Sequence, residues 1–124
     1  MGAGASIDGV VDDLKTKGNS AFKSQDYSEA LICYSAAIDE AEKGGDSEPA
    51  LQAALFSNRA AALLACHQNE AALADAQRAI AHRPAWPKPY LRAARALLAL
   101  DRAGAAREML KKAITLTKSI ELNK

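Results

Sequence analysis

The chain has 124 residues, a length that suits one domain and is too short for two. Hydrophobic residues make up 49% of it and aromatic residues only 5%, so alanine and leucine dominate the apolar content. This composition suits closely packed helices and disfavours a β-sandwich or barrel, which needs more β-branched and aromatic residues. The formal net charge of +1 excludes a general nucleic-acid binder that relies on bulk positive charge.

Membrane spans, metal sites and cofactor sites leave no signal in the sequence. No apolar run approaches the roughly 20 residues that a membrane-spanning helix requires. Cys33 and Cys66 show no CxxC spacing and no histidine at metal-ligand spacing, so we expect neither a metal nor a cofactor. Nothing near the N-terminus resembles a signal peptide, and we therefore expect a cytoplasmic, reducing environment.

The chain repeats itself at an offset of 34 residues, and this period is the strongest signal for the fold. Segments 53–86 and 87–120 align with each other, and a third copy at 11–44 is followed by an extra stretch, 45–52. Only small residues fit where two helices cross closely. The same three positions of every copy hold glycine or alanine: Gly18, Ala30 and Ala37; Ala60, Ala72 and Ala79; and Ala94, Ala106 and Ala113.

A 34-residue unit with small residues at these positions resembles the tetratricopeptide repeat (TPR), a helix–turn–helix that stacks into a solenoid. Tyr34 at the aromatic position of the first copy and Pro84 at the end of the second strengthen the resemblance. It implies an all-α fold, a right-handed superhelical solenoid of three repeats. We expect a flexible leader at 1–7 and a single TPR domain at 8–124.

Helix-start and helix-end signals fall where this register requires them. Asp26 with Glu29 three residues later predicts a capping box at the start of the second helix. Gly44 and Gly45 end that helix, and Asn69 is a candidate N-cap for the fourth. The six helices are expected at about 8–23, 27–43, 48–66, 69–82, 86–99 and 103–121.

The last repeat is followed only by residues 121–124, whereas repeat arrays generally need a polar element over their last apolar face. Either the last helix continues through Ile120 and Leu122, or a separate cap lies outside this sequence. The apolar face around Leu116 and Ile120 is a candidate surface for weak self-association. We therefore expect a monomer or a weak dimer that forms through the last helix.

The first helix of each repeat lines the concave face of such a stack, and polar residues recur there at helical spacing. Lys15 and Asn19 lie four residues apart, Lys88 and Arg92 repeat that spacing, and Asn58 lies on the helix between them. Two cations four residues apart repel by roughly 0.2–0.5 kcal/mol when no anion is present. In a chain of nearly neutral net charge, this local concentration of charge predicts an anion-binding site.

These residues resemble the dicarboxylate clamp of the TPR co-chaperones of the 70- and 90-kDa heat-shock proteins: Lys15, Asn19, Asn58, Lys88 and Arg92. In that family the clamp holds the partner's C-terminal Glu-Glu-Val-Asp through its terminal carboxylate and the side chain of the last aspartate. The resemblance implies a protein–protein interaction module that binds the tails of one or both chaperones. We expect secondary peptide contacts from an apolar floor and one further cation: Phe22, Ala61, Leu64 and Arg95.

Other functions remain open on the sequence alone. An enzyme is not expected, because His67 and His82 come with no paired carboxylates, nucleophile elbow or phosphate loop. One alternative is a repeat scaffold whose groove binds a different acidic segment. Another is a membrane-tethered adaptor, because residues 1–6 satisfy the pattern for N-myristoylation at Gly2. A single acyl chain anchors a protein only marginally, and a flexible Gly/Ala leader explains the same residues.

Overall fold

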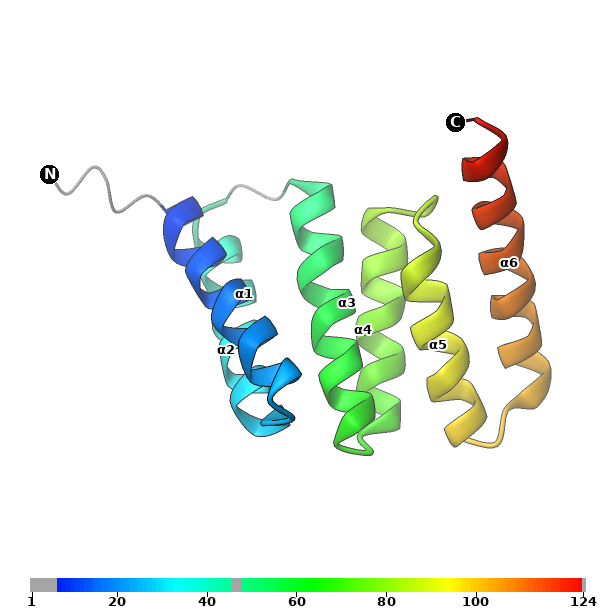
Figure 1. The fold of residues 1–124 in the computed structure, drawn as a ribbon, viewed down its shortest axis with the longest axis horizontal. Helices are drawn as coiled ribbons and strands as arrows, with labels where there is room; N and C mark the ends of the chain where they lie inside the picture. Colours follow the sequence, from blue (N-terminus) through cyan, green and yellow to red (C-terminus); the bar gives the residue numbers. More distant parts are fainter. Residues whose placement is uncertain (1–6, 46–47, 124) are drawn as a thin grey trace, which may run out of the picture.

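The computed structural model describes residues 7–45 and 48–123 and folds them into six helices, with no strand among these residues (Figure 1). Every helix boundary lies within one residue of the position expected from the sequence, so the all-α prediction is confirmed. The helices are α1 (Ile7–Lys23), α2 (Tyr27–Lys43), α3 (Pro49–Ala65), α4 (Asn69–His82), α5 (Pro87–Ala99) and α6 (Ala103–Leu122).

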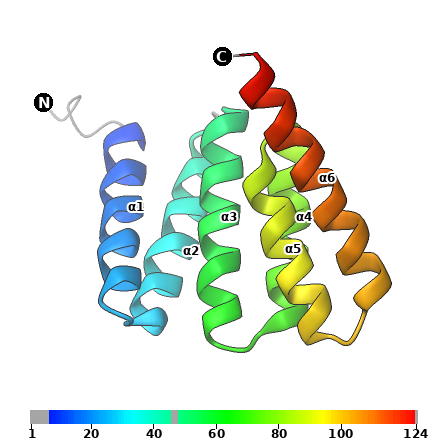
Figure 2. The same cartoon turned by 45° about the vertical axis from the view of Figure 1, so that its right-hand side comes forward.

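The helices form three antiparallel hairpins, α1–α2, α3–α4 and α5–α6, which stack side by side in one row (Figures 1 and 2). Successive hairpins pack through α2 against α3 and through α4 against α5. The first helices also contact one another, α1 with α3 and α3 with α5, whereas the second helices make no comparable contacts within the described residues. The closer approach of α1, α3 and α5 makes theirs the concave face, and these three helices run in the same direction (Figure 1).

Each hairpin turn contains one residue with a left-handed backbone. These residues are Gln25, His67 and Asp101, with φ angles of 64°, 60° and 62°. A positive φ favours glycine, because other residues place a Cβ against the backbone. The three turns therefore share one backbone geometry although none of them has glycine at this position.

The predicted start and end of α2 are largely confirmed. Asp26 Oδ1 accepts a hydrogen bond from the Glu29 backbone N–H at 3.2 Å, which is one half of the expected capping box. The Glu29 carboxylate accepts instead from the Cys33 thiol at 3.8 Å, and no reciprocal bond to Asp26 is present in the described part of the chain. Gly44 caps the C-terminus of α2, and Gly45 follows it with a φ of 69°.

The predicted N-cap of α4 is wrong by one residue. Asn69 is the first residue of the helix, and Gln68 is its N-cap. The turn decides this, because the Gln68 backbone N–H donates to the Leu63 carbonyl at 2.9 Å and the Gln68 carbonyl accepts from the Ala72 N–H at 3.0 Å. A residue whose carbonyl accepts the first helical hydrogen bond is the N-cap, whatever its side chain.

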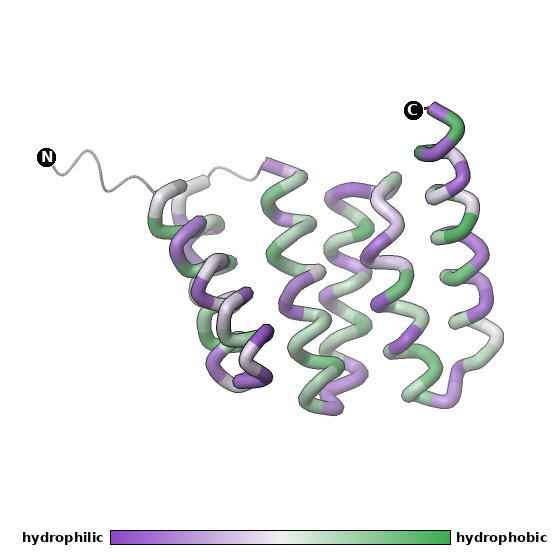
Figure 3. The backbone as a smooth tube through the Cα atoms, in the orientation of Figure 1, coloured by the Kyte–Doolittle hydropathy of each residue, from purple (hydrophilic) through white to green (hydrophobic). Residues whose placement is uncertain are grey.

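Small residues allow the helices to pack closely, as the repeat predicted. The eight alanines at the repeat positions are all buried, and so is Gly18. Apolar and polar residues alternate along the helices in Figure 3, as expected when each helix buries one face. A Cβ at Gly18 would lie 2.5 Å from Tyr34 Cε1, so the Tyr34 ring requires glycine at this position.

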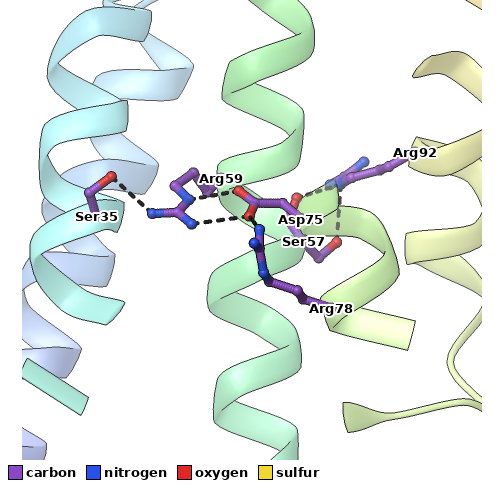
Figure 4. Close-up of polar contacts among 6 residues, drawn as sticks. All are labelled: Ser35, Ser57, Arg59, Asp75, Arg78 and Arg92. Atoms are coloured by element: carbon purple, nitrogen blue, oxygen red, sulfur yellow. Dashed lines mark hydrogen bonds and ion pairs between the residues drawn. The ribbon is translucent and has the colours of Figure 1, made fainter. Parts of the chain in front are cut away.

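A buried ionic network joins the first two hairpins (Figure 4). Asp75 on α4 is only 1% exposed, and Arg59 on α3 holds it through two contacts, Nε–Oδ2 at 2.6 Å and Nη2–Oδ1 at 3.0 Å. Arg78 donates to Asp75 Oδ1 at 2.9 Å, and Arg59 Nη1 donates to Ser35 Oγ on α2 at 3.2 Å. The hydrogen bond to Asp75 raises the pKa of Arg59 above its ordinary value.

The last helix leaves apolar side chains in contact with solvent. Ile114, Ile120 and Leu122 are exposed, whereas Leu116 is partly buried. Self-association through this helix stays a prediction.

No helix in the described ranges is both long and apolar enough to cross a membrane. Gly2 and most of the expected leader lie outside the described residues, so lipidation there also stays a prediction.

Candidate functional site

A hollow of about 210 Å³ opens on the concave face, with residues of α1, α2, α3 and α5 around it. Three of the five predicted clamp residues line this hollow, and each comes from a different helix of the concave face. The lining residues are Asn19, Phe22, Lys23, Tyr34, Asn58, Ala61 and Arg92.

The other two predicted clamp residues, Lys15 and Lys88, do not line the hollow. Lys15 precedes Asn19 by four residues, and Lys88 precedes Arg92 by four, so each lysine lies one turn closer to the N-terminus of its helix. Helices α1 and α5 run in the same direction (Figure 1), so both lysines lie on the same side of the lining residues Asn19 and Arg92, toward the N-terminal ends of these helices. The Lys88 ammonium lies 5.9 Å from the centroid of the Trp86 ring.

The side-chain amide of Asn19 is held in one orientation by two donors. Tyr34 Oη donates to Asn19 Oδ1 at 2.6 Å, and Asn58 Nδ2 donates to the same oxygen at 3.4 Å. The oxygen is therefore occupied, whereas the two N–H groups of Asn19 Nδ2 have no partner among the described residues and can bind a ligand. The second N–H of Asn58 Nδ2 has no partner in the described part of the chain either, and both asparagines line the hollow.

Tyr34 also belongs to the site, although in the sequence it is recognisable only as an aromatic position of the repeat. Its ring is buried against Gly18, which fixes its hydroxyl beside Asn19. Burial raises the pKa of the Tyr34 phenol, and Cys33 raises it further, although the nearby Arg92 guanidinium acts in the opposite direction. The phenol therefore stays protonated and continues to donate to Asn19.

Arg92 is anchored at one end of its guanidinium (Figure 4). Its Nε donates to the Ser57 carbonyl at 2.9 Å and to Ser57 Oγ at 3.1 Å. Ser57 is fully buried on α3, and its role as an anchor is not visible in the sequence. The two bonds occupy only Nε, and the four N–H groups of Nη1 and Nη2, which have no partner within the described ranges, can bind a ligand.

No carboxylate of the described residues neutralises the charge of Arg92. Burial lowers its pKa, and the positive charge of Arg95 lowers it further. Among the described residues, no ion pair includes Lys15, Lys88, Arg92 or Arg95. An anion in the hollow would therefore gain charge-assisted hydrogen bonds and would relieve the repulsion between these cations.

A second hollow, of about 550 Å³, continues from the first toward the C-terminal ends of α3 and α5. The two hollows share three lining residues, so they form one continuous groove: Phe22, Ala61 and Arg92. All four predicted secondary contacts line the second hollow: Phe22, Ala61, Leu64 and Arg95. Within the described ranges, no carboxylate lines either hollow.

The two histidines lie in different surroundings. His67 lines the second hollow, whereas His82 stacks on Phe56 with ring centroids 5.9 Å apart. Three or more His, Cys, Asp or Glu residues that together could hold a metal ion do not occur in the part of the chain that the structure describes.

Comparison with known proteins identifies the type of repeat. No protein-family model matches the chain. The Protein STIP1 homolog of Dictyostelium discoideum is 43% identical over 90 residues, which cover 73% of this chain and 14% of that protein. The Hsp70-Hsp90 organizing protein of Triticum aestivum is 38% identical over 112 residues, which cover 90% of this chain and 18% of that protein.

Solved structures agree with these relatives. The TPR2B-domain:pHsp70 complex of yeast Sti1 matches with a TM-score of 0.80 and 27% identity, covering 92% of this chain and 85% of that one. The chain is a TPR domain. This TPR domain also matches the second TPR domain of human RPAP3, solved with the HSP70 peptide SGPTIEEVD, with a TM-score of 0.79 and 26% identity over 90% of this chain and 86% of that one.

The TPR domain spans less than a fifth of the length of the first curated relatives it matches, 14% and 18%. Their names therefore describe much longer proteins, of which this domain corresponds to one part.

Proposed function

We propose that the TPR domain is a peptide-binding module of the co-chaperone type that holds the C-terminal Glu-Glu-Val-Asp of 70- or 90-kDa heat-shock chaperones in a dicarboxylate clamp. The relatives and matching structures support this partner, since two of the structures were solved with Hsp70 peptides. The clamp consists of the five residues that resemble the family's: Lys15, Asn19, Asn58, Lys88 and Arg92. We propose a binding module and not an enzyme, and a cytoplasmic location.

One observation carries the proposal: Arg92, whose Nη groups have no carboxylate partner among the described residues, lines the same hollow as Asn19 and Asn58. A C-terminal aspartate carries two carboxylates within a few ångströms of each other, and each accepts charge-assisted hydrogen bonds of about 1.5–3 kcal/mol. Lys15 and Lys88 each precede a lining residue by one helical turn, and they add positive charge on the same side of the hollow.

Titration calorimetry with two forms of SGPTIEEVD, a free acid and a C-terminal amide, tests the clamp directly. Amidation removes one of the two carboxylates, so we expect the affinity to fall by at least about tenfold. Lys15→Ala and Arg92→Ala should weaken binding of the free acid by a similar factor with unchanged helical content. Arg107→Ala, which removes an exposed cation on α6, is the matched control and should bind as the wild type does.

The alternative of a groove for another acidic segment predicts a different pattern. In that case Arg92→Ala weakens binding of an internal acidic sequence, whereas the free acid and the amide bind equally. Equal affinity for the two forms would therefore contradict the clamp.

A further inference from the structure

A further pair of cations lies on opposite walls of the groove, one on α1 and one on α5. Each is about one helical turn C-terminal to a residue of the proposed clamp. Lys23 follows Asn19 by four residues on α1, and Arg95 follows Arg92 by three residues on α5. Lys23 lines the first hollow and Arg95 the second, and both side chains are exposed to solvent. Helix α3 lies between the two walls, because it contacts both α1 and α5.

Neither cation has a partner of opposite charge within the described ranges, where no ion pair includes Lys23 or Arg95. No carboxylate of the described residues lines the two hollows that these cations border. The groove is therefore also positively charged between the clamp and the second hollow. A bound tail that extends from the clamp into the second hollow would pass these two cations.

The spacing fits two adjacent acidic residues of an extended tail. In an extended tail, the third and fourth residues from the C-terminus lie about 7–10 Å from the last residue. Lys23 and Arg95 lie about one helical turn, about 5.4 Å, from the clamp residues on their helices. The long side chains of lysine and arginine can span the difference. Neighbouring side chains of an extended chain point to opposite sides. The third and fourth residues from the C-terminus therefore point to opposite sides of an extended tail, and the groove offers one cation on each wall.

We infer, on the basis of the proposed function, that Lys23 and Arg95 are specificity-determining residues that each bind one of the two adjacent glutamates of the tail. The domain then recognises four carboxylates, two at the chain end and two upstream. A C-terminal aspartate without acidic residues at the third and fourth positions is a poorer ligand for this groove. The proposed clamp alone does not make that distinction.

Double-mutant cycles between peptide and protein test this inference. The peptides are the free acids SGPTIEEVD, SGPTIEQVD and SGPTIQEVD, which replace one glutamate at a time by neutral glutamine. The proteins are the wild type, Lys23→Ala, Arg95→Ala and the control Arg107→Ala. Calorimetry gives the affinity of each combination, and circular dichroism confirms equal helical content.

We expect each glutamine peptide to bind the wild type about two- to fivefold more weakly than SGPTIEEVD, the range for solvent-exposed ion pairs. Lys23→Ala should lose its sensitivity to one of the two glutamates, Arg95→Ala should lose it to the other, and Arg107→Ala should keep both. Coupling at only one cation or at neither, or an equal loss in the control, overturns the inference and leaves the clamp intact. Failure of the wild type to bind SGPTIEEVD overturns the proposed function as well.

Discussion

The Tyr34 hydroxyl lies 2.6 Å from Asn19 Oδ1, and this contact connects the core of the first hairpin to the candidate clamp. The Tyr34 ring packs on Gly18, the residue before Asn19 in α1. One turn of α1 therefore has two roles: Gly18 leaves space for the Tyr34 ring, and Asn19 carries the amide that the Tyr34 hydroxyl orients. A packing residue of the repeat thus also sets the geometry of the binding site.

Tyr34→Phe should weaken peptide binding in addition to any loss of stability, because the Tyr34 hydroxyl orients Asn19. Without the hydroxyl, Asn19 Oδ1 keeps only the 3.4 Å bond from Asn58, so the amide is free to rotate. Loss of one hydrogen bond costs about 1 kcal/mol, and we expect an affinity for SGPTIEEVD about fivefold lower by calorimetry.

Tyr90→Phe is the matched control for this change. The Tyr90 hydroxyl donates to the Pro84 carbonyl at 2.7 Å, and Tyr90 lines neither hollow. It should lower the free energy of unfolding by a similar amount, about 1 kcal/mol, with unchanged affinity. An equal loss of affinity in both variants would contradict the orienting role of Tyr34.

Gly18→Ala should destabilise the domain, although helix propensity alone predicts the opposite. Alanine stabilises a helix interior by about 1 kcal/mol relative to glycine. At Gly18, however, the new Cβ would lie 2.5 Å and 2.7 Å from two ring atoms of buried Tyr34. Overpacking of this kind costs about 1–3 kcal/mol, so urea denaturation should show a net loss of stability.

Gly104→Ala separates the two effects. A Cβ at Gly104 in α6 would meet no atom within 4 Å. This variant should therefore gain about 0.5 kcal/mol from helix propensity. The prediction fails if Gly18→Ala is as stable as the wild type.

Asp75→Asn should be among the most destabilising single substitutions in the domain. It removes the charge that Arg59 and Arg78 share and leaves the partly buried Arg59 without its main partner. Breaking a buried ion pair from one side typically costs about 3–5 kcal/mol, and we expect about 2–4 kcal/mol because Arg59 retains some access to water.

The exposed pair of Glu70 and Arg102 provides the comparison. Its side chains are 68% and 53% exposed, and Glu70→Gln should change the free energy of unfolding by less than about 1 kcal/mol. Urea denaturation of both variants measures the difference. Similar losses for Asp75→Asn and Glu70→Gln would mean that the buried network is not a major source of stability.

The domain should lose stability at alkaline pH, in part because of Cys33. Burial, followed by the nearby Glu29 carboxylate, raises the pKa of the Cys33 thiol above its ordinary value of 9.0. The unfolded chain therefore releases the thiol proton at a lower pH than the folded chain does. The contribution is fully present below about pH 9 and is lost as the pH rises through the raised pKa of the folded state.

Denaturation of the wild type and of Cys33→Ala at about pH 7 and about pH 10 measures this contribution. The variant loses some packing at both pH values, so the informative quantity is the change between them. The free energy of unfolding should fall less with pH in Cys33→Ala than in the wild type. Identical falls would show that this thiol does not contribute.

Much of the fold follows from the sequence because its determinants are local. The 34-residue period, the small residues at its fixed positions and the Asp26 cap predicted every helix to within one residue. The Asn69 cap was mispredicted because a left-handed residue and a backbone hydrogen bond of the preceding turn select Gln68 instead. The side chain of one candidate N-cap residue therefore does not determine the backbone geometry of the turn, and it is this geometry that sets the first residue of the helix.

Helical spacing and the repeat register, both readable from the sequence, place Asn19, Asn58 and Arg92 on the sides of their helices that face the groove. How these groups are held depends on contacts between helices, which the folded chain alone reveals. Tyr34 orients Asn19 from 15 residues away, and Ser57 anchors Arg92 from 35 residues away. Such contacts join different helices, and their geometry depends on how closely the hairpins pack.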